Sequence, residues 1–113
     1  MANKLTVGLA QIDCTLGAVE ENLQKHLEWM DRARQEGVEL LLFPELSITG
    51  YRLLHLSSRV SCRIEESEKL HHLAEAAGEM AVVVGLVEED GQGVLYNSAV
   101  LLRAGQIVHV HRK

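Results

Sequence analysis

The feature that most constrains the fold is an apolar run that stops at a proline and is followed at once by a glutamate. Residues 40–43 read Leu-Leu-Leu-Phe, and Pro44 and Glu45 come next. Pro44 has no N–H to donate and a fixed φ, so regular strand pairing should stop there. Glu45 is then expected at the rim of a sheet, where open α/β sheets bind ligands. Glu45 is therefore the first candidate for a catalytic group, with an exposed glutamate beside a turn as the alternative.

The residues before this run predict a strand and a helix. Residues 4–10 form a short apolar segment that alternates only weakly, as a strand covered on both faces does, and we expect this strand near the centre of the sheet. Apolar residues then recur every three or four positions over 19–33 and predict a helix that stops at Gly37. With a strand over 38–43, these elements form a βαβ unit, whose crossover is right-handed in nearly all known cases.

A second helix and three further strands are expected after an irregular loop at 52–63. The glutamates at 65, 66 and 68 suit the first turn of a helix, and a stripe of leucine and alanine continues to Gly78. The connection Ala104-Gly105 favours an antiparallel hairpin. The predicted strands cover residues 80–87, 94–103 and 106–112. The predicted order is β-α-β-α-β-β-β, which is an α/β chain with a mixed sheet.

Composition indicates a single compact unit and argues against several partners. The 113 residues are 47% hydrophobic with one proline, and no segment is typical of a linker. The formal charge of −5 is spread along the chain without a basic stripe, so nucleic acid and anionic membrane surfaces are not expected partners. No apolar run reaches the roughly 20 residues of a membrane span, and residues 1–4 lack the apolar core of a signal peptide, so we expect a cytoplasmic location.

Five short passages of the sequence resemble motifs of the nitrilase superfamily, the carbon-nitrogen hydrolases. In chain order they are Val7-Gly8-Leu9-Ala10-Gln11, Phe43-Pro44-Glu45-Leu46, Thr49-Gly50-Tyr51, Tyr96-Asn97-Ser98-Ala99 and His111-Arg112-Lys113. The first is similar to the opening strand of the family, the next two to its first catalytic motif, and the last two to its approach to the catalytic lysine. The resemblance implies a Glu-Lys-Cys site with Glu45 as the glutamate and Lys113 as the lysine. Tyr51 is a candidate for lining the substrate pocket, or packs where the loop turns.

The resemblance also implies a fold, the four-layer α-β-β-α sandwich, of which this chain would be the N-terminal half. A sheet with two helices on one face leaves its other apolar face to be covered, by a later part of the chain, by a partner or by a second copy. We therefore expect residues 1–113 to be the N-terminal part of one carbon-nitrogen hydrolase domain, with the nucleophilic cysteine in the remainder. The expected natural state is a homo-oligomer.

The implied reaction is hydrolysis of a carbon–nitrogen bond of a small amide or nitrile through a thioester, without a metal or an organic cofactor. A thiol near neutral pH needs a base to take its proton, which is the role implied for Glu45. A fixed ammonium stabilises negative charge that develops on the substrate, which is the role implied for Lys113. We expect both side chains to face one cavity at the carboxyl rim of adjacent strands. Amide, nitrile, carbamoyl compound and glutamine all remain open as substrates.

A non-catalytic binding or dimerisation module is the alternative, although a module kept only for packing has no physical need for Glu45 and Lys113. His109 and His111 point to one side of a predicted strand, but a metal site needs a third ligand and a polar strand face is the simpler interpretation. Cys14 and Cys62 share no metal-type or redox-type spacing and are expected to remain thiols. Cys14 also lies at the expected rim, where the family pattern puts no nucleophile.

Overall fold

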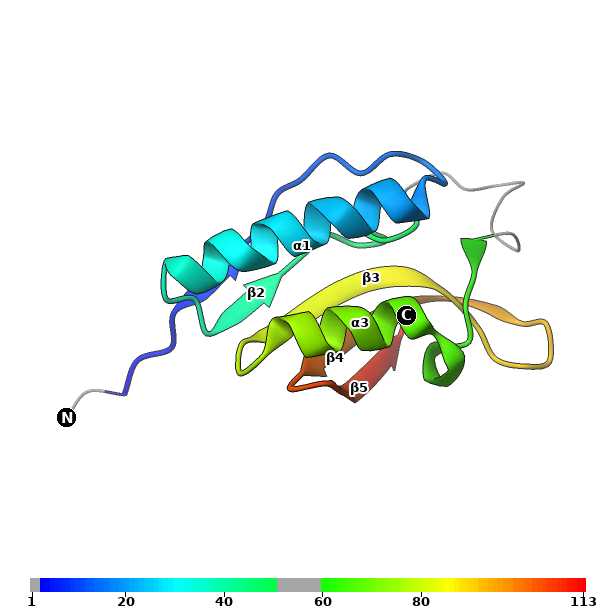
Figure 1. The fold of residues 1–113 in the computed structure, drawn as a ribbon. Helices are drawn as coiled ribbons and strands as arrows, with labels where there is room; N and C mark the ends of the chain where they lie inside the picture. The colour runs from blue at the N-terminus through cyan, green and yellow to red at the C-terminus, as the bar shows by residue number, and fades with distance from the viewer. Residues whose placement is uncertain (1–2, 51–59) are drawn as a thin grey trace.

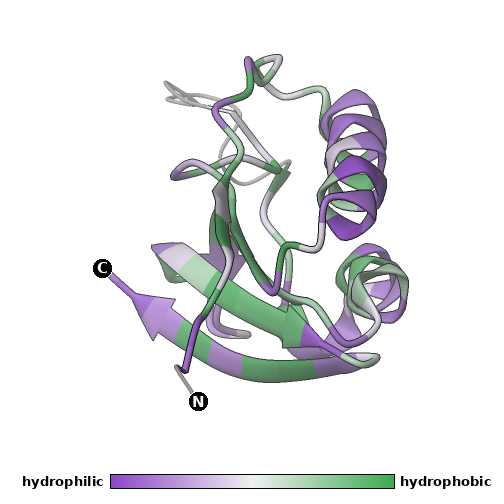
Figure 2. Ribbon diagram, turned by 90° about the vertical axis from the view of Figure 1, so that its left-hand side faces the viewer, coloured by the Kyte–Doolittle hydropathy of each residue, from purple (hydrophilic) through white to green (hydrophobic). Residues whose placement is uncertain are grey.

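The computed structural model describes residues 3–50 and 60–113, and within them it forms one sheet with two α-helices on one side (Figures 1 and 2). The strands are β1 (Val7–Leu9), β2 (Leu40–Leu42), β3 (Ala81–Glu89), β4 (Leu95–Arg103) and β5 (Gln106–Arg112). The helices are α1 (Val19–Gln35), α3 (Glu68–Ala77) and the short 3-10 helix η1 (Ile64–Glu66). Over the described residues, the predicted order β-α-β-α-β-β-β is confirmed.

The strands lie side by side in chain order, from β1 to β5. The pairs β1–β2 and β2–β3 are parallel, and Leu41 of β2 lies between Gly8 and Val82. The pairs β3–β4 and β4–β5 are antiparallel, with Val100 of β4 between Val84 and Val110. Long connections that contain a helix lead to the parallel strands, and short hairpins join the antiparallel strands. Parallel pairs need such a long crossover, whereas antiparallel pairs do not.

Strand β1 lies at the edge of the sheet, so the expectation that it would be central was wrong. Its residues Val7 and Leu9 are 46% and 77% exposed. A short apolar run indicates a strand but carries no information on which strands pair on each side of it. Order in the sheet depends on contacts between distant segments.

The start of the second predicted helix also differs from the structure. Glu65 and Glu66 belong to η1 and not to the first turn of α3. Helix α3 begins after Ser67, whose side-chain oxygen accepts the N–H of Leu70 at 3.2 Å. Such a cap satisfies one of the backbone donors that a helix start leaves unpaired.

The core lies between the sheet and the two helices, on the side to which both helices pack (Figure 2). The largest wholly buried apolar side chains come from both layers and are Met30, Leu70, Leu73, Val82, Val84, Leu86, Val100 and Leu102. The opposite face of the sheet carries Leu42, Val83 and Leu101, which are only partly buried. An apolar face left open in this way is where the second half of a sandwich packs.

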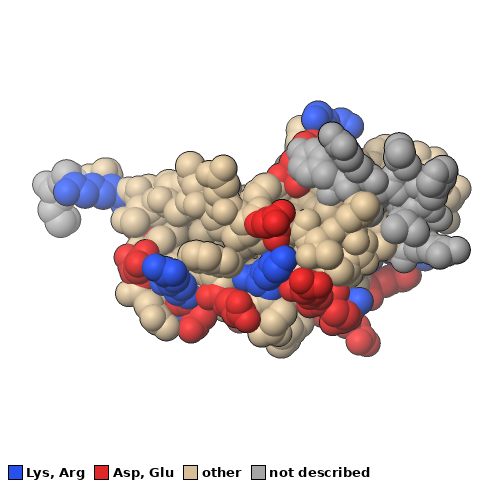
Figure 3. Space-filling model, turned by 90° about the horizontal axis from the view of Figure 1, so that it is seen from above, with Lys and Arg blue, Asp and Glu red and all other residues tan. Residues whose placement is uncertain are grey.

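Charged side chains are distributed over the outer surface. On the face seen in Figure 3, acidic and basic side chains are interspersed without a wide patch of one sign. Among residues 3–50 and 60–113, no helix combines the length and the apolar character needed to cross a bilayer.

Candidate active site

Glu45 lies in a turn that leaves β2 and is attached to β3. Phe43 still pairs with β3, because its N–H donates to the Val83 carbonyl at 2.9 Å. The turn then returns to the same strand at Ile48, whose N–H donates to the Gly85 carbonyl at 2.8 Å. The turn that carries Glu45 is thus held against β3 at both of its ends.

The absence of a side chain at Gly85 allows this turn to lie directly on the sheet. A Cβ at Gly85 would be 2.3 Å from the Leu46 nitrogen and 2.9 Å from the Pro44 oxygen. Leu46 itself has a φ of 52°, in the left-handed region that costs a residue with a side chain roughly 1–2 kcal/mol. Backbone strain of this kind persists only where the surrounding structure maintains it, and it is common at functional sites.

Two hydrogen-bond donors from the part of the sheet formed by β4 and β5 contact the Glu45 carboxylate. Lys113 Nζ is 2.9 Å from Glu45 Oε1, and Asn97 Nδ2 donates to the same oxygen at 2.6 Å. Asn97 lies on β4 and Lys113 follows β5, and the Lys113 backbone N–H donates to the Asn97 carbonyl at 2.9 Å. The Glu45 side chain is 34% exposed and that of Lys113 75%, so the pair is open to solvent.

The structure therefore brings Glu45 and Lys113 together, but not from adjacent strands as expected. Strands β3 and β4 lie between β2 and β5. The turn with Glu45 crosses β3 at Gly85, and Lys113 reaches past Asn97 on β4. The two side chains meet because the turn extends sideways across β3, and not because their strands are neighbours.

Glu45 and Lys113 line a hollow of about 360 Å³. Its apolar lining includes Phe43, Val83 and Ala99, and Asn97 and His111 add polar groups. Small-molecule sites typically combine an apolar lining with a few convergent polar groups in a volume of this order. The arrangement can place a carboxylate, an ammonium and an amide around one small substrate.

The other candidates from the sequence lie apart from this pair or outside the described residues. Tyr51 is outside the described residues, as are positions 52–59 of the predicted loop. His111 borders the hollow, and His109 lines a second hollow of about 930 Å³ that runs along β5. In the described ranges 3–50 and 60–113, no group of three His, Cys, Asp or Glu side chains is arranged to hold a metal ion.

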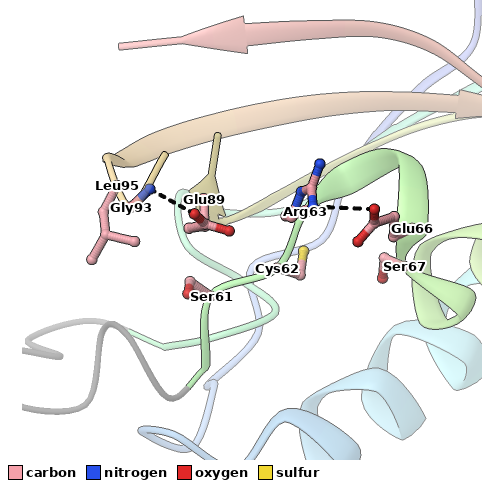
Figure 4. A pocket seen from close by; sticks show the side chains of 8 residues that line it. All are labelled: Ser61, Cys62, Arg63, Glu66, Ser67, Glu89, Gly93 and Leu95. Atoms are coloured by element: carbon pink, nitrogen blue, oxygen red, sulfur yellow. Dashed lines mark hydrogen bonds and ion pairs between the residues drawn. The ribbon is translucent and has the colours of Figure 1, made fainter. Parts of the chain in front are cut away.

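Neither described cysteine is activated as a nucleophile. Burial raises the pKa of the Cys14 thiol, and burial also raises the pKa of Cys62. A raised pKa lowers the thiolate fraction at neutral pH. Cys62 lines a separate hollow of about 500 Å³ with Arg63 and Glu66, which shares no lining residue with the hollow of Glu45 and Lys113 (Figure 4).

Sequence reasoning missed the contact of Asn97 with Glu45. The sequence placed Asn97 in a matching passage, Tyr96-Asn97-Ser98-Ala99, and that passage was the signal that could have identified it. Asn97 and Glu45 are 52 positions apart, and they meet because β4 pairs with β3 and the Glu45 turn lies across β3 at Gly85.

The chain belongs to the carbon-nitrogen hydrolase family, whose family model matches residues 6–113. It is 37% identical, over 97% of its length, to a glutamine-dependent NAD(+) synthetase of Thermotoga maritima, and 39% identical, over 90%, to one of Synechocystis. The crystal structure of a glutamine-dependent NAD(+) synthetase from Cytophaga hutchinsonii superposes on 96% of the chain with a TM-score of 0.81 and 27% identity. The chain spans about a fifth of the length of these relatives. The fold is that of part of an α-β-β-α sandwich, as the sequence predicted.

Proposed function

We propose that this chain contributes the base and the stabilising cation of a site that hydrolyses the side-chain amide of glutamine within a longer protein. The observation that carries the proposal is the 2.9 Å contact between Glu45 Oε1 and Lys113 Nζ beside the hollow of about 360 Å³. A carbon-nitrogen hydrolase cleaves a C–N bond, and the matched synthetases depend on glutamine, whose side chain contains such a bond. The ammonia released would be used by a synthetase part of the same protein.

In the proposed reaction the nucleophile is a cysteine thiol supplied by another part of the polypeptide. Glu45 takes the thiol proton, and the sulfur attacks the amide carbon while the carbonyl electrons move to oxygen. Lys113 stabilises this oxyanion. The protonated Glu45 then donates to the amide nitrogen, the C–N bond breaks and ammonia leaves, with a thioester remaining.

The same carboxylate completes the cycle. Glu45 takes a proton from a water molecule, and the resulting hydroxide attacks the thioester carbon. The C–S bond then breaks while Glu45 returns its proton to the leaving sulfur, which gives glutamate, the thiol and the ionised Glu45. One group can serve in both halves only if it is held in one place throughout. Oε1 of Glu45 accepts one hydrogen bond from the Lys113 ammonium and one from the Asn97 amide. These two donors support this requirement because they restrict the orientation of the carboxylate.

The proposal is tested by ammonia release from glutamine, catalysed by the full-length polypeptide. Glu45→Gln keeps size and hydrogen-bonding capacity but removes the base, so kcat should fall by a factor on the order of 10²–10⁴ with little change in KM. Lys113→Met should lower kcat by a factor on the order of 10²–10³. Because both groups act in one unit, the double variant should be scarcely slower than the slower single variant.

Matched controls come from charged residues away from the hollow. Glu79→Gln and Lys69→Met make the same chemical changes at exposed ion pairs with Arg103 and Glu20, and both should leave kcat unchanged. Near-normal turnover in Glu45→Gln, or fully additive losses in the double variant, would refute the assignment of the pair. Release of ammonia from small nitriles or other amides but not from glutamine would refute the substrate.

A further inference from the structure

A buried polar chain between α1 and the Glu45 turn is not used by the proposed reaction. His26 of α1 and Ser47 of the turn are both 0% exposed, and His26 Nε2 is 2.8 Å from Ser47 Oγ. His26 Nδ1 is 2.6 Å from the Asn22 carbonyl oxygen. The backbone N–H of Gly85 donates to Ser47 Oγ at 3.1 Å. These four groups connect the helix, the turn and strand β3.

The two ends of this polar chain determine which atom donates in the hydrogen bonds made by the Asn22 carbonyl and the Gly85 N–H. A carbonyl oxygen only accepts, so His26 carries its proton on Nδ1 and donates it to Asn22. A backbone N–H only donates, so Ser47 Oγ accepts from Gly85. In the neutral imidazole Nε2 carries no proton, so the Ser47 hydroxyl donates to it. Burial favours that state, because it lowers the pKa of His26 from 6.5 to about 4.

Ser47 closes the turn that contains Glu45. The Ser47 N–H donates to the Pro44 carbonyl at 3.1 Å, which makes Glu45 and Leu46 the two central residues of a β-turn. A positive φ at the third position of such a turn is normally adopted by glycine or asparagine, and here Leu46 adopts it. The turn is therefore not stable through its own sequence. It depends on contacts made by its neighbours, and Ser47 makes them through its side chain.

Helix α1 supplies the rigid side of these contacts. Asn22 Nδ2 also donates to the Ile48 carbonyl at 2.9 Å, immediately after Ser47. The His26 ring packs on that of Phe43, with 4.2 Å between the ring centroids, immediately before Pro44. Both ends of the turn are thus attached to one helix face, and the Glu45 carboxylate projects from the part between them.

We infer that His26 and Ser47 are positioning residues, which hold Glu45 in reach of Lys113 through the hydrogen bond between the imidazole and the hydroxyl. The inference rests on the proposed function, in which Glu45 must remain in one place through two proton transfers. A displacement of about 1 Å in a catalytic group can cost a factor on the order of 10² in rate. A histidine that only fills the core would affect stability and not kcat.

The test compares two replacements of His26 in the full-length polypeptide. His26→Leu provides a side chain that fills the core but cannot accept from Ser47, whereas His26→Gln provides an amide oxygen that can. We expect His26→Leu and Ser47→Ala each to lower kcat for ammonia release from glutamine by a factor of about 10–100, with KM within about twofold. His26→Gln should recover most of the loss. The double variant His26→Leu, Ser47→Ala should be no slower than Ser47→Ala.

Met30→Leu is the matched control, because Met30 is also buried on α1, at 1% exposure, and takes no part in the polar chain. Thermal unfolding of every variant separates lost stability from lost turnover, and kcat is expressed per folded enzyme. Equal kcat values in His26→Leu and His26→Gln would overturn the inference, as would a loss of kcat in Met30→Leu as large as that in His26→Leu. If Ser47→Ala does not fold, the two His26 variants alone decide.

Crystal structures of the same variants keep this inference separate from the proposed function. If the wild-type protein releases no ammonia from glutamine, the proposed function fails, and the position of Glu45 still decides the inference. The contact of Glu45 Oε1 with Lys113 Nζ, 2.9 Å in the native chain, should be lost in His26→Leu and kept in His26→Gln and Met30→Leu. An unchanged contact in His26→Leu and Ser47→Ala would overturn it.

Discussion

Replacing Gly85 with alanine should reduce catalysis more than stability, because Gly85 lies under the backbone of the Glu45 turn. The added Cβ would be 2.3 Å from the Leu46 nitrogen, whereas ordinary contacts begin at 3.4 Å, so the turn must move away by about 1 Å. The contacting atoms are backbone atoms, which cannot rotate away as a side chain can. The turn itself must therefore shift, and Glu45 with it.

The expected magnitude follows from this displacement. A shift of about 1 Å corresponds to a factor on the order of 10² in kcat, or about 3 kcal/mol of activation free energy. Overpacking by one methyl group should in addition lower the free energy of unfolding by about 1–3 kcal/mol. The assay is steady-state ammonia release by the full-length polypeptide, together with thermal unfolding of the same sample.

Gly8→Ala provides the control for Gly85→Ala. Gly8 is also in a strand, and its added Cβ would meet only side-chain atoms of Leu41 and Val38, at 3.1 Å. It should change the free energy of unfolding by less than Gly85→Ala does and leave kcat within about twofold, because its near neighbours are side-chain atoms that can give way and no backbone of the Glu45 turn is displaced. A Gly85→Ala enzyme with native kcat, or equal losses of kcat in both variants, would refute the reasoning.

Three further predictions follow from the structure. Arg112→Met should lower the free energy of unfolding at neutral pH, because it removes two hydrogen bonds from the nearly buried Glu88 carboxylate, while the half-exposed position of Arg112 limits the loss. Arg112 holds the pKa of Glu88 below its usual 4.5, so the difference in stability between the variant and the wild type should disappear as the pH falls through the lowered pKa. Unfolding curves of the two proteins that differ equally at about pH 7 and about pH 3 would contradict this expectation. The pKa of His26 is lowered from 6.5 to about 4, so between these pH values the unfolded chain binds a proton that the folded chain does not. About 3 kcal/mol of stability should therefore be lost as the pH falls from 6.5 to 4. Denaturant titrations of His26→Gln should lack this part of the pH dependence. Residues 1–113 expressed alone should associate through the uncovered sheet face, and sedimentation as a single monomeric species with cooperative unfolding would count against that architecture.

Local sequence patterns predicted most of the elements of this fold. The three-and-four spacing of apolar residues predicted α1, and Pro44 correctly marked the end of strand pairing after β2. The two-residue connection Ala104-Gly105 correctly predicted the hairpin of β4 and β5. Each of these features depends on residues within a few positions of one another, and their physical causes, helical periodicity and the missing proline N–H, act at that range.

The candidate site was predicted in part. The motif around Glu45 and the one before Lys113 indicated the two residues, and the structure places them 2.9 Å apart. The contacts that hold them were not predicted, since Asn97 is 52 positions from Glu45, and His26 is 21 positions from Ser47. Helical periodicity puts His26 on the same face as Leu23 and Met30, but no sequence pattern shows which distant side chain it contacts.

By itself, the sequence determined the type and order of the strands and helices, the family of the chain and which residues carry a carboxylate and an ammonium at strand ends. Only the tertiary structure decided that β1 lies at the sheet edge, that Gly85 lies beneath Leu46, and that a helix side chain reaches the turn after β2. The physical reason is range. Periodicity, capping and proline effects act along the chain, whereas strand order and register arise from the packing of segments that are distant in sequence.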